Sequence, residues 1–100
     1  MGEVKREYYE TGELEEEWFE VNGKKEGECK WYHENGQLWI IWNFVNEKLE
    51  GESKEYYENG QLSNICNFVN GKLEGEEKIY YTDGQLREII NQDSFKCFIL

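Results

Sequence analysis

The stretch Tyr56-Tyr57-Glu58-Asn59-Gly60-Gln61-Leu62 is the strongest indication of the fold of this chain, because it recurs three more times with small changes. The same seven positions read YYETGEL at 8–14, YHENGQL at 32–38 and YYTDGQL at 80–86, so successive copies stand 24 residues apart. A unit this short cannot bury a hydrophobic face alone, so neighbouring copies must stack to share a core. The chain of 100 residues is therefore predicted to be four copies of one unit.

Each copy contains two short runs of strand-forming residues, for example 29–33 and 38–45, on either side of a glycine turn. The chain has no proline, and no window keeps a helical period beyond a few residues. This pattern predicts an all-β fold, a single antiparallel meander of four tandem β-hairpin repeats in a twisted or curled one-layer sheet. We expect one repeat domain over 1–100, with hairpins at about 3–22, 27–46, 51–70 and 75–91, and residues 92–100 as a C-terminal cap.

The glycine dipeptides predict which turns are tight. Two-residue type I′ turns favour Asn-Gly and Asp-Gly, which occur at 35–36, 59–60 and 83–84. The connections through 22–23, 46–47 and 70–71 are then expected to be longer. A two-residue turn at 35–36 would pair Tyr32 with Trp39, and Trp31 with Ile40.

That register sorts the side chains into two faces by strict alternation. The main apolar face is expected to carry Tyr9, Leu14, Trp18, Trp31, His33, Leu38, Ile40, Trp42, Phe44, Tyr57, Leu62, Cys66, Phe68, Tyr81, Leu86 and Ile90. The opposite face is expected to carry a tyrosine column and a basic column, together with Trp39 and Ile41: Tyr8, Tyr32, Tyr56 and Tyr80, and Arg6, Lys30, Lys54 and Lys78.

The composition points to a protein partner. Twenty-two acidic and 11 basic residues give a formal charge of −11, which should repel nucleic-acid phosphates and anionic lipid head groups. Such a field would steer the chain toward a basic protein surface. The three cysteines, Cys29, Cys66 and Cys97, show no metal-binding or disulfide spacing, and a cytoplasmic location is expected. No leader or membrane span is indicated.

No constellation for catalysis stands out. His33 is the only histidine and occupies a tyrosine position of the repeat, which favours a structural substitute over a catalytic base. The cysteines are scattered among polar and apolar repeat positions, and the glutamates lack the spacing of a calcium loop. We therefore expect no enzyme activity, no cofactor and no metal site.

The segments 56–62 and 67–76, YYENGQL and NFVNGKLEGE, resemble the MORN-type repeats, in particular the short variant found in bacterial antitoxin-like proteins. The resemblance extends from about residue 3 to about residue 91. It implies a row of β-hairpins that acts as a protein-binding or scaffolding surface.

Two departures from the repeat are the candidate partner-binding sites. Aromatic residues, the type enriched at interface hot spots, concentrate in copy two at Trp31, Tyr32, Trp39 and Trp42. The alternative is that these tryptophans form the core. Acidic residues concentrate in copy one at Glu13, Glu15, Glu16, Glu17 and Glu20. They form either a solvated edge that blocks aggregation or an acidic face that occupies a phosphate-binding groove.

These observations lead to a functional hypothesis, a non-enzymatic inhibitor or antitoxin-like protein that blocks a basic partner. A nuclease or other nucleic-acid-handling enzyme is the expected target, either a toxin or, for a phage-borne gene, a host defence effector such as a CRISPR nuclease. The alternative hypothesis is a structural scaffold that acts by self-association or by bridging proteins, since strands at both ends of the sheet would be exposed.

Overall fold

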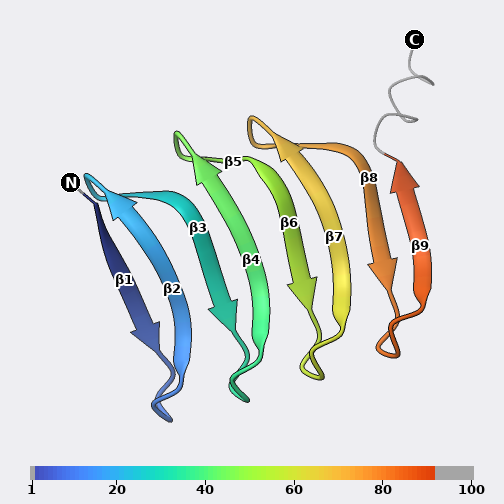
Figure 1. Ribbon diagram of the computed structural model, residues 1–100, viewed down its shortest axis with the longest axis horizontal. Coiled ribbons are helices and arrows are strands. Elements are labelled where there is room, and N and C mark those ends of the chain that lie inside the picture. Colours follow the sequence, from blue (N-terminus) through green and yellow to red (C-terminus); the bar gives the residue numbers. More distant parts are fainter. Residues whose placement is uncertain (1, 92–100) are drawn as a thin grey trace.

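The computed structural model describes residues 2–91, which form one antiparallel sheet (Figure 1). The strands pair in the order β1-β2-β3-β4-β6-β7-β8-β9, and the short β5 also pairs with β4. Their bounds are β1 Gly2–Tyr8, β2 Leu14–Val21, β3 Lys24–Tyr32, β4 Leu38–Val45, β5 Lys48–Leu49, β6 Gly51–Tyr56, β7 Leu62–Val69, β8 Lys72–Tyr80 and β9 Leu86–Asn91. The predicted all-β meander of hairpins is confirmed. The expected cap at 92–100 lies outside the described residues.

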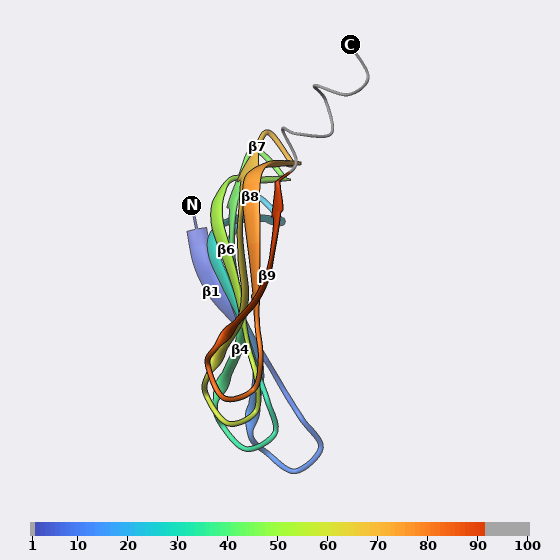
Figure 2. The ribbon, with the colours of Figure 1, turned by 90° about the vertical axis from the view of Figure 1, so that its right-hand side faces the viewer.

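The sheet is a single layer. Its principal extents are 47 × 36 × 15 Å, and the edge-on view shows one thin, twisted layer (Figure 2). Among the described residues only Cys29, at 0% exposure, and Ser53, at 7%, are buried. A one-layer sheet covers neither face with a second layer, so most apolar side chains stay half-buried. No helix in residues 2–91 is long and apolar enough to cross a membrane.

The tight turns lie where the longer connections were expected. Both central residues have positive φ at Asn22-Gly23 (53° and 78°), Asn46-Glu47 (52° and 69°) and Asn70-Gly71 (52° and 82°), as type I′ turns require. These two-residue turns join β2 to β3, β4 to β5 and β7 to β8. The prediction of type I′ turns at 35–36, 59–60 and 83–84 is therefore wrong.

The repeat glycine instead closes a three-residue connection. The N–H of Gly36 donates to the carbonyl of His33, and the N–H of His33 donates to the carbonyl of Gln37, both at 2.9 Å. Only Gly36 has positive φ, at 90°, so Asn35 keeps an ordinary backbone conformation. Its side chain accepts the Gln37 N–H at 2.9 Å and donates from Nδ2 to the carbonyl of Glu58 at 2.8 Å. The Asn thus caps its own turn and ties it to the turn of the next copy.

The extra turn residue changes the expected faces. The predicted pair of Trp31 with Ile40 is confirmed, but a bulge follows, and Tyr32 lies opposite Leu38 rather than Trp39. Since a shift of one residue moves a side chain to the other face, the repeat leucines join the tyrosine column. The assignment of Leu14, Leu38, Leu62 and Leu86 to the main apolar face is wrong.

The register defines the two faces. We call one the tryptophan face, and its central row is Glu7, Glu16, Trp31, Ile40, Glu55, Asn64, Ile79 and Glu88. We call the other the lysine face, and its central row is Arg6, Glu17, Lys30, Ile41, Lys54, Ile65, Lys78 and Ile89.

Side chains also tie each copy to the next. The hydroxyl of Tyr9 donates to the carbonyl of Tyr32 at 2.5 Å, and the hydroxyl of Tyr57 donates to the carbonyl of Tyr80 at 2.7 Å. Between them, Nε2 of His33 lies 2.9 Å from the carbonyl oxygen of Tyr56. His33 therefore makes the contact that tyrosine makes in the neighbouring copies, which is the structural role expected of it.

Candidate interaction surface

The four tryptophans gather on the tryptophan face of β2, β3 and β4. The rings of Trp31 and Trp42 meet edge to face, with centroids 5.1 Å apart, and Trp42 meets Phe44 in the same way at 6.2 Å. Cys29 lies opposite Trp18 on one side and Trp42 on the other, and is fully buried. Burial raises the pKa of its thiol. A small side chain between two indoles is thus the most deeply buried of the described residues.

A lysine sits within this cluster. The Nζ atom of Lys25 lies 5.0 Å from the ring centroid of Trp18 and 5.1 Å from that of Trp31. The same Nζ bonds to Oε2 of Glu16 at 2.7 Å, and the Glu16 side chain is only 15% exposed. An ammonium held by two indoles and a carboxylate is a cation–π arrangement. The tryptophan face thus holds one ammonium group of the chain itself among its aromatic rings.

Trp39 joins the same face through the bulge. Its ring stacks on His33 with a centroid distance of 5.0 Å and an interplanar angle of 24°. Its Nε1 donates to Oε2 of Glu55 at 3.3 Å, and Glu55 lies opposite Ile40 on the tryptophan face. The expectation that Trp39 lies on the opposite face is wrong, because the bulge turns it toward this one.

The remaining candidates do not form one site. Tyr32 lies on the lysine face, opposite Leu38. In the acidic stretch, Glu16 and Glu20 lie on the tryptophan face, and Glu20 accepts the Trp18 Nε1 proton at 2.9 Å. Glu17 lies on the lysine face and pairs with Arg6 at 2.7 Å.

The other two acidic candidates lie beside the first turn. Oε2 of Glu13 accepts from Oγ1 of Thr11 at 2.5 Å. Glu15 is the extra residue at the β1–β2 bulge. The pKa of the Tyr9 phenol is raised by burial and, to a smaller extent, by the charge of Glu15. Copy one therefore presents its glutamates in several directions rather than as one acidic face.

Charge differs between the two faces. On the tryptophan face the register-paired strand positions carry seven carboxylates and two cations: Glu3, Glu7, Glu16, Glu20, Glu55, Glu77 and Glu88, with Lys5 and Lys25. The lysine face carries five carboxylates and seven cations: Glu17, Glu28, Glu52, Glu74 and Glu76, with Arg6, Lys24, Lys30, Lys48, Lys54, Lys72 and Lys78. The negative charge of the sheet is thus one-sided.

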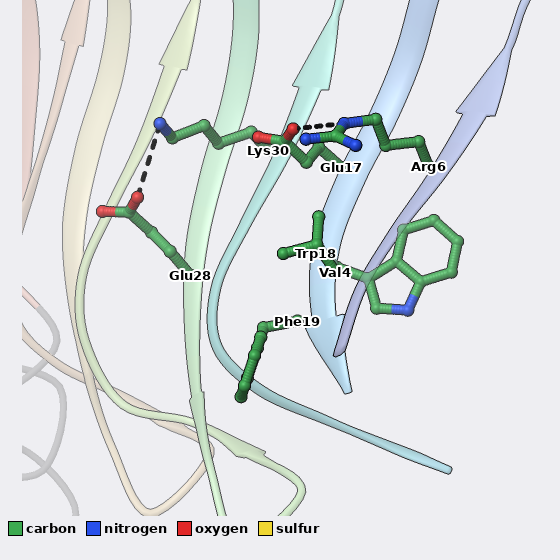
Figure 3. Close-up of a pocket in the computed structure, with 7 residues that line it drawn as sticks. All are labelled: Val4, Arg6, Glu17, Trp18, Phe19, Glu28 and Lys30. Carbon is green, nitrogen blue, oxygen red and sulfur yellow. Dashed lines mark hydrogen bonds and ion pairs between the residues drawn. The ribbon is translucent and has the colours of Figure 1, made fainter. Parts of the chain in front are cut away.

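A shallow hollow of about 250 Å³ opens on the lysine face near the first hairpin (Figure 3). Two ion pairs border it, Arg6 with Glu17 and Lys30 with Glu28, and the Phe19 ring closes one side. Its charged groups neutralise one another at distances of 2.7 and 3.5 Å. The hollow therefore offers no converging set of unpaired groups for a ligand or a reaction.

Two members of the surface were not singled out from the sequence. Lys25 occupies the position at which later copies have Leu49 and Leu73, so a departure from the repeat did mark it. Glu55 occupies the position of Trp31 in copy two, and only the bulge geometry shows that it meets Trp39. Within residues 2–91 no group of three or more His, Cys, Asp or Glu side chains could hold a metal ion.

Comparison with known families identifies the repeat. A family model described as a MORN repeat variant matches four segments, residues 4–19, 25–46, 49–70 and 73–93. None of the curated proteins compared with the chain matches it. Repeats of this family generally mediate protein or membrane interactions and scaffolding, and the family is generally non-catalytic. The four matched segments cover most of the chain and coincide with its hairpins, so the protein belongs to the MORN repeat family.

Proposed function

We propose that this protein is a non-enzymatic binding protein whose tryptophan face holds a partner with a basic surface. The observation that carries the proposal is the coincidence of all four tryptophans with the carboxylate-rich face. Aromatic rings supply large contact area at low entropic cost, and carboxylates select arginine and lysine side chains. The position of Lys25, between two indoles and beside Glu16, supports the proposal, because it is an example within the chain of a cation bound by these groups.

The charge half of the proposal can be tested with two matched triple variants. Glu20→Gln, Glu55→Gln and Glu77→Gln remove three charges from the tryptophan face, and their amide oxygens still accept the existing hydrogen bonds. Glu28→Gln, Glu52→Gln and Glu76→Gln remove three charges from the lysine face. The probe is a ten-residue arginine-rich peptide, with binding measured by fluorescence anisotropy over a salt series.

The two variants should respond differently. The tryptophan-face variant should bind the peptide about tenfold more weakly, with a shallower salt dependence, since close charge pairs contribute on the order of 1 kcal/mol or more at an interface. The lysine-face variant should bind within about twofold of the parent. Equal weakening of both variants would mean that net charge alone accounts for peptide binding, and would contradict a specific role of the tryptophan face.

A narrower target class extends the proposal. Carboxylates on a sheet can take the place of phosphates, so the proposed partner is a nuclease or other nucleic-acid-handling enzyme, blocked in an antitoxin-like manner in the cytoplasm. A partner captured from the source cell should then bind either the protein or duplex DNA or RNA, but not both. A stable ternary complex of partner, protein and nucleic acid would contradict this target class and leave the tryptophan-face proposal standing.

A scaffold is the second candidate function. It is favoured by the two outermost strands of the described sheet, where Val4 and Tyr8 on β1 and Ile89 on β9 are about half exposed, at 52%, 58% and 48%. An unpaired strand edge is a template for association with another chain.

A further inference from the structure

The two ends of the sheet are the two halves of a junction that occurs three times inside the molecule. At each internal junction the second strand of one copy pairs with the first strand of the next: β2 with β3, β4 with β6, and β7 with β8. Within residues 2–91, β9 is a second strand with no first strand paired beyond it, and β1 is a first strand with no second strand paired before it. We propose that β9 of one molecule pairs with β1 of another in this same register, which gives a head-to-tail array.

The backbone register of such a pair follows from the repeat. Ile41 lies opposite Lys54 and Ile65 lies opposite Lys78 at internal junctions. One repeat further on, Ile89 would lie opposite Arg6 of the second molecule. An aliphatic side chain opposite the stem of a basic one is thus the rule at two internal junctions and is reproduced at the end.

The side-chain hydrogen bonds that join one copy to the next could also form at this junction. In the interior, Tyr9, His33 and Tyr57 each reach the carbonyl of a tyrosine 23 residues later. Tyr81 is the fourth member of this series, is 52% exposed, and has no later copy to reach within residues 2–91. The carbonyl of Tyr8 in a second molecule would stand where the series places its acceptor.

The packing of the repeat leucines also supports pairing of β9 with β1. Leu38 and Tyr56 line one hollow across an internal junction, and Leu38 and Leu62 are half-buried. Leu86, at the end of the same column, is 49% exposed, while Tyr8, at the start of the tyrosine column, is 58% exposed. Each end therefore exposes the apolar group that the other end would cover.

Two acidic residues weaken this junction. Glu88 would lie directly opposite Glu7 of the second molecule, whereas the internal pairs in this row are Glu16 with Trp31, Ile40 with Glu55, and Asn64 with Ile79. Asp83 stands where Asn35 and Asn59 donate to the next turn, and an ionised carboxylate cannot donate. Like charges across a strand pair are destabilising, so association is limited to high protein concentration.

The test is a concentration series of the full chain by sedimentation velocity with light scattering. The variant Glu88→Gln with Asp83→Asn should associate at least about fivefold more tightly than the parent, since it removes the repulsion and restores the donor. The control variant Glu34→Gln with Glu58→Gln changes the net charge equally at exposed turn positions and should leave the dissociation constant within about twofold. Ile89→Lys, which places a second cation opposite Arg6, should abolish association.

The stoichiometry tests the geometry. A head-to-tail contact leaves both ends of the growing array open, so the mass should rise through three and four copies without a plateau. A plateau at two copies would overturn the proposal in favour of a symmetric contact. Equal association of the two double variants, or an Ile89→Lys variant that still associates while its melting curve is unchanged, would overturn the β9–β1 register. Tyr81→Phe tests the same end without altering charge, and should weaken association.

Discussion

Copies two and four share one sequence pattern but differ in what surrounds them. Strand β4 of copy two is half-buried along nearly its whole length, while all six residues of β9 in copy four are exposed. Copy two has a neighbour on both sides and carries three of the four tryptophans, whereas within residues 2–91 copy four pairs with a neighbour on one side. Burial in each hairpin of this sheet therefore depends on the hairpins beside it.

The largest expected effect compares Trp42 with its repeat equivalent Ile90. Trp42→Ala should lower the free energy of unfolding by about 3 kcal/mol, because the indole packs against Trp31 and Phe44 and covers Cys29. Ile90→Ala, at a position already 36% exposed, should cost less than about 1 kcal/mol. Urea unfolding followed by tryptophan fluorescence and circular dichroism measures both. Equal losses would contradict the difference between the copies.

The second prediction compares two adjacent lysines at the start of copy two, one as the test and one as the control. Lys25→Ala should cost about 1–2 kcal/mol, since it removes two cation–π contacts and leaves the half-buried Glu16 without its partner. Lys24→Ala should cost less than about 0.5 kcal/mol, because Lys24 and its partner Glu47 are 62% and 61% exposed. Thermal unfolding of both variants should show a lower melting temperature for Lys25→Ala alone.

The third effect concerns the ties between turns. Asn35→Asp keeps the acceptor for the Gln37 N–H but loses the donor to the Glu58 carbonyl, which should cost about 1 kcal/mol. Asp83→Asn in copy four changes the same position where no later turn follows within residues 2–91, so its unfolding free energy should stay within about 0.3 kcal/mol at low protein concentration. If Asp83→Asn stabilised the protein under those conditions, the new side-chain amide would have found a hydrogen-bond acceptor, which would contradict this prediction.

The smallest effect is a gain in copy two. Glu47 holds a φ of 69° in a turn where copies one and three have glycine. Glu47→Gly should stabilise the protein by about 0.5–1 kcal/mol, since it relieves the left-handed strain at the cost of some unfolded-state entropy. Gly71→Glu is the reverse change in copy three, where φ is 82°, and should destabilise by a similar amount. Melting temperatures that move in the same direction for both would refute the strain argument.

The sequence was sufficient to predict the architecture and insufficient to predict the faces. A 24-residue period and paired strand runs determine a meander of hairpins with little dependence on detail. The side on which Leu38 and Trp39 lie depends on whether Asn35-Gly36 closes a two-residue or a three-residue connection. The three-residue connection also closes at Gly12 and Gly84, although Thr11 and Asp83 replace the asparagine there. The dipeptide preference alone therefore does not determine the length of the connection, and with it the face on which the next side chains lie.

The candidate site could also be predicted from the sequence only in part. Comparison of the copies marked the tryptophans of copy two, and three of the four aromatic candidates lie on one face. The acidic stretch of copy one looked continuous in the sequence, but a strand directs neighbouring side chains to opposite faces, so Glu16 and Glu17 point apart. The partnership of Lys25 with Trp18 and Trp31 joins two strands through a bulged junction and has no local sequence signature beyond the lost leucine.

The central claim is that the tryptophan face is the binding surface, and the four indole N–H groups report on it directly. In a nitrogen-15 correlation spectrum, a titration with the arginine-rich peptide should shift the indole signals of Trp18, Trp31, Trp39 and Trp42, and an acidic peptide of equal length should shift none. In a carbon-13 correlation spectrum, the methyl signals of Ile41, Ile65 and Ile89, which belong to the lysine-face row, should move little. Shifts confined to the lysine-face row, with all four indole signals unmoved, would contradict the account.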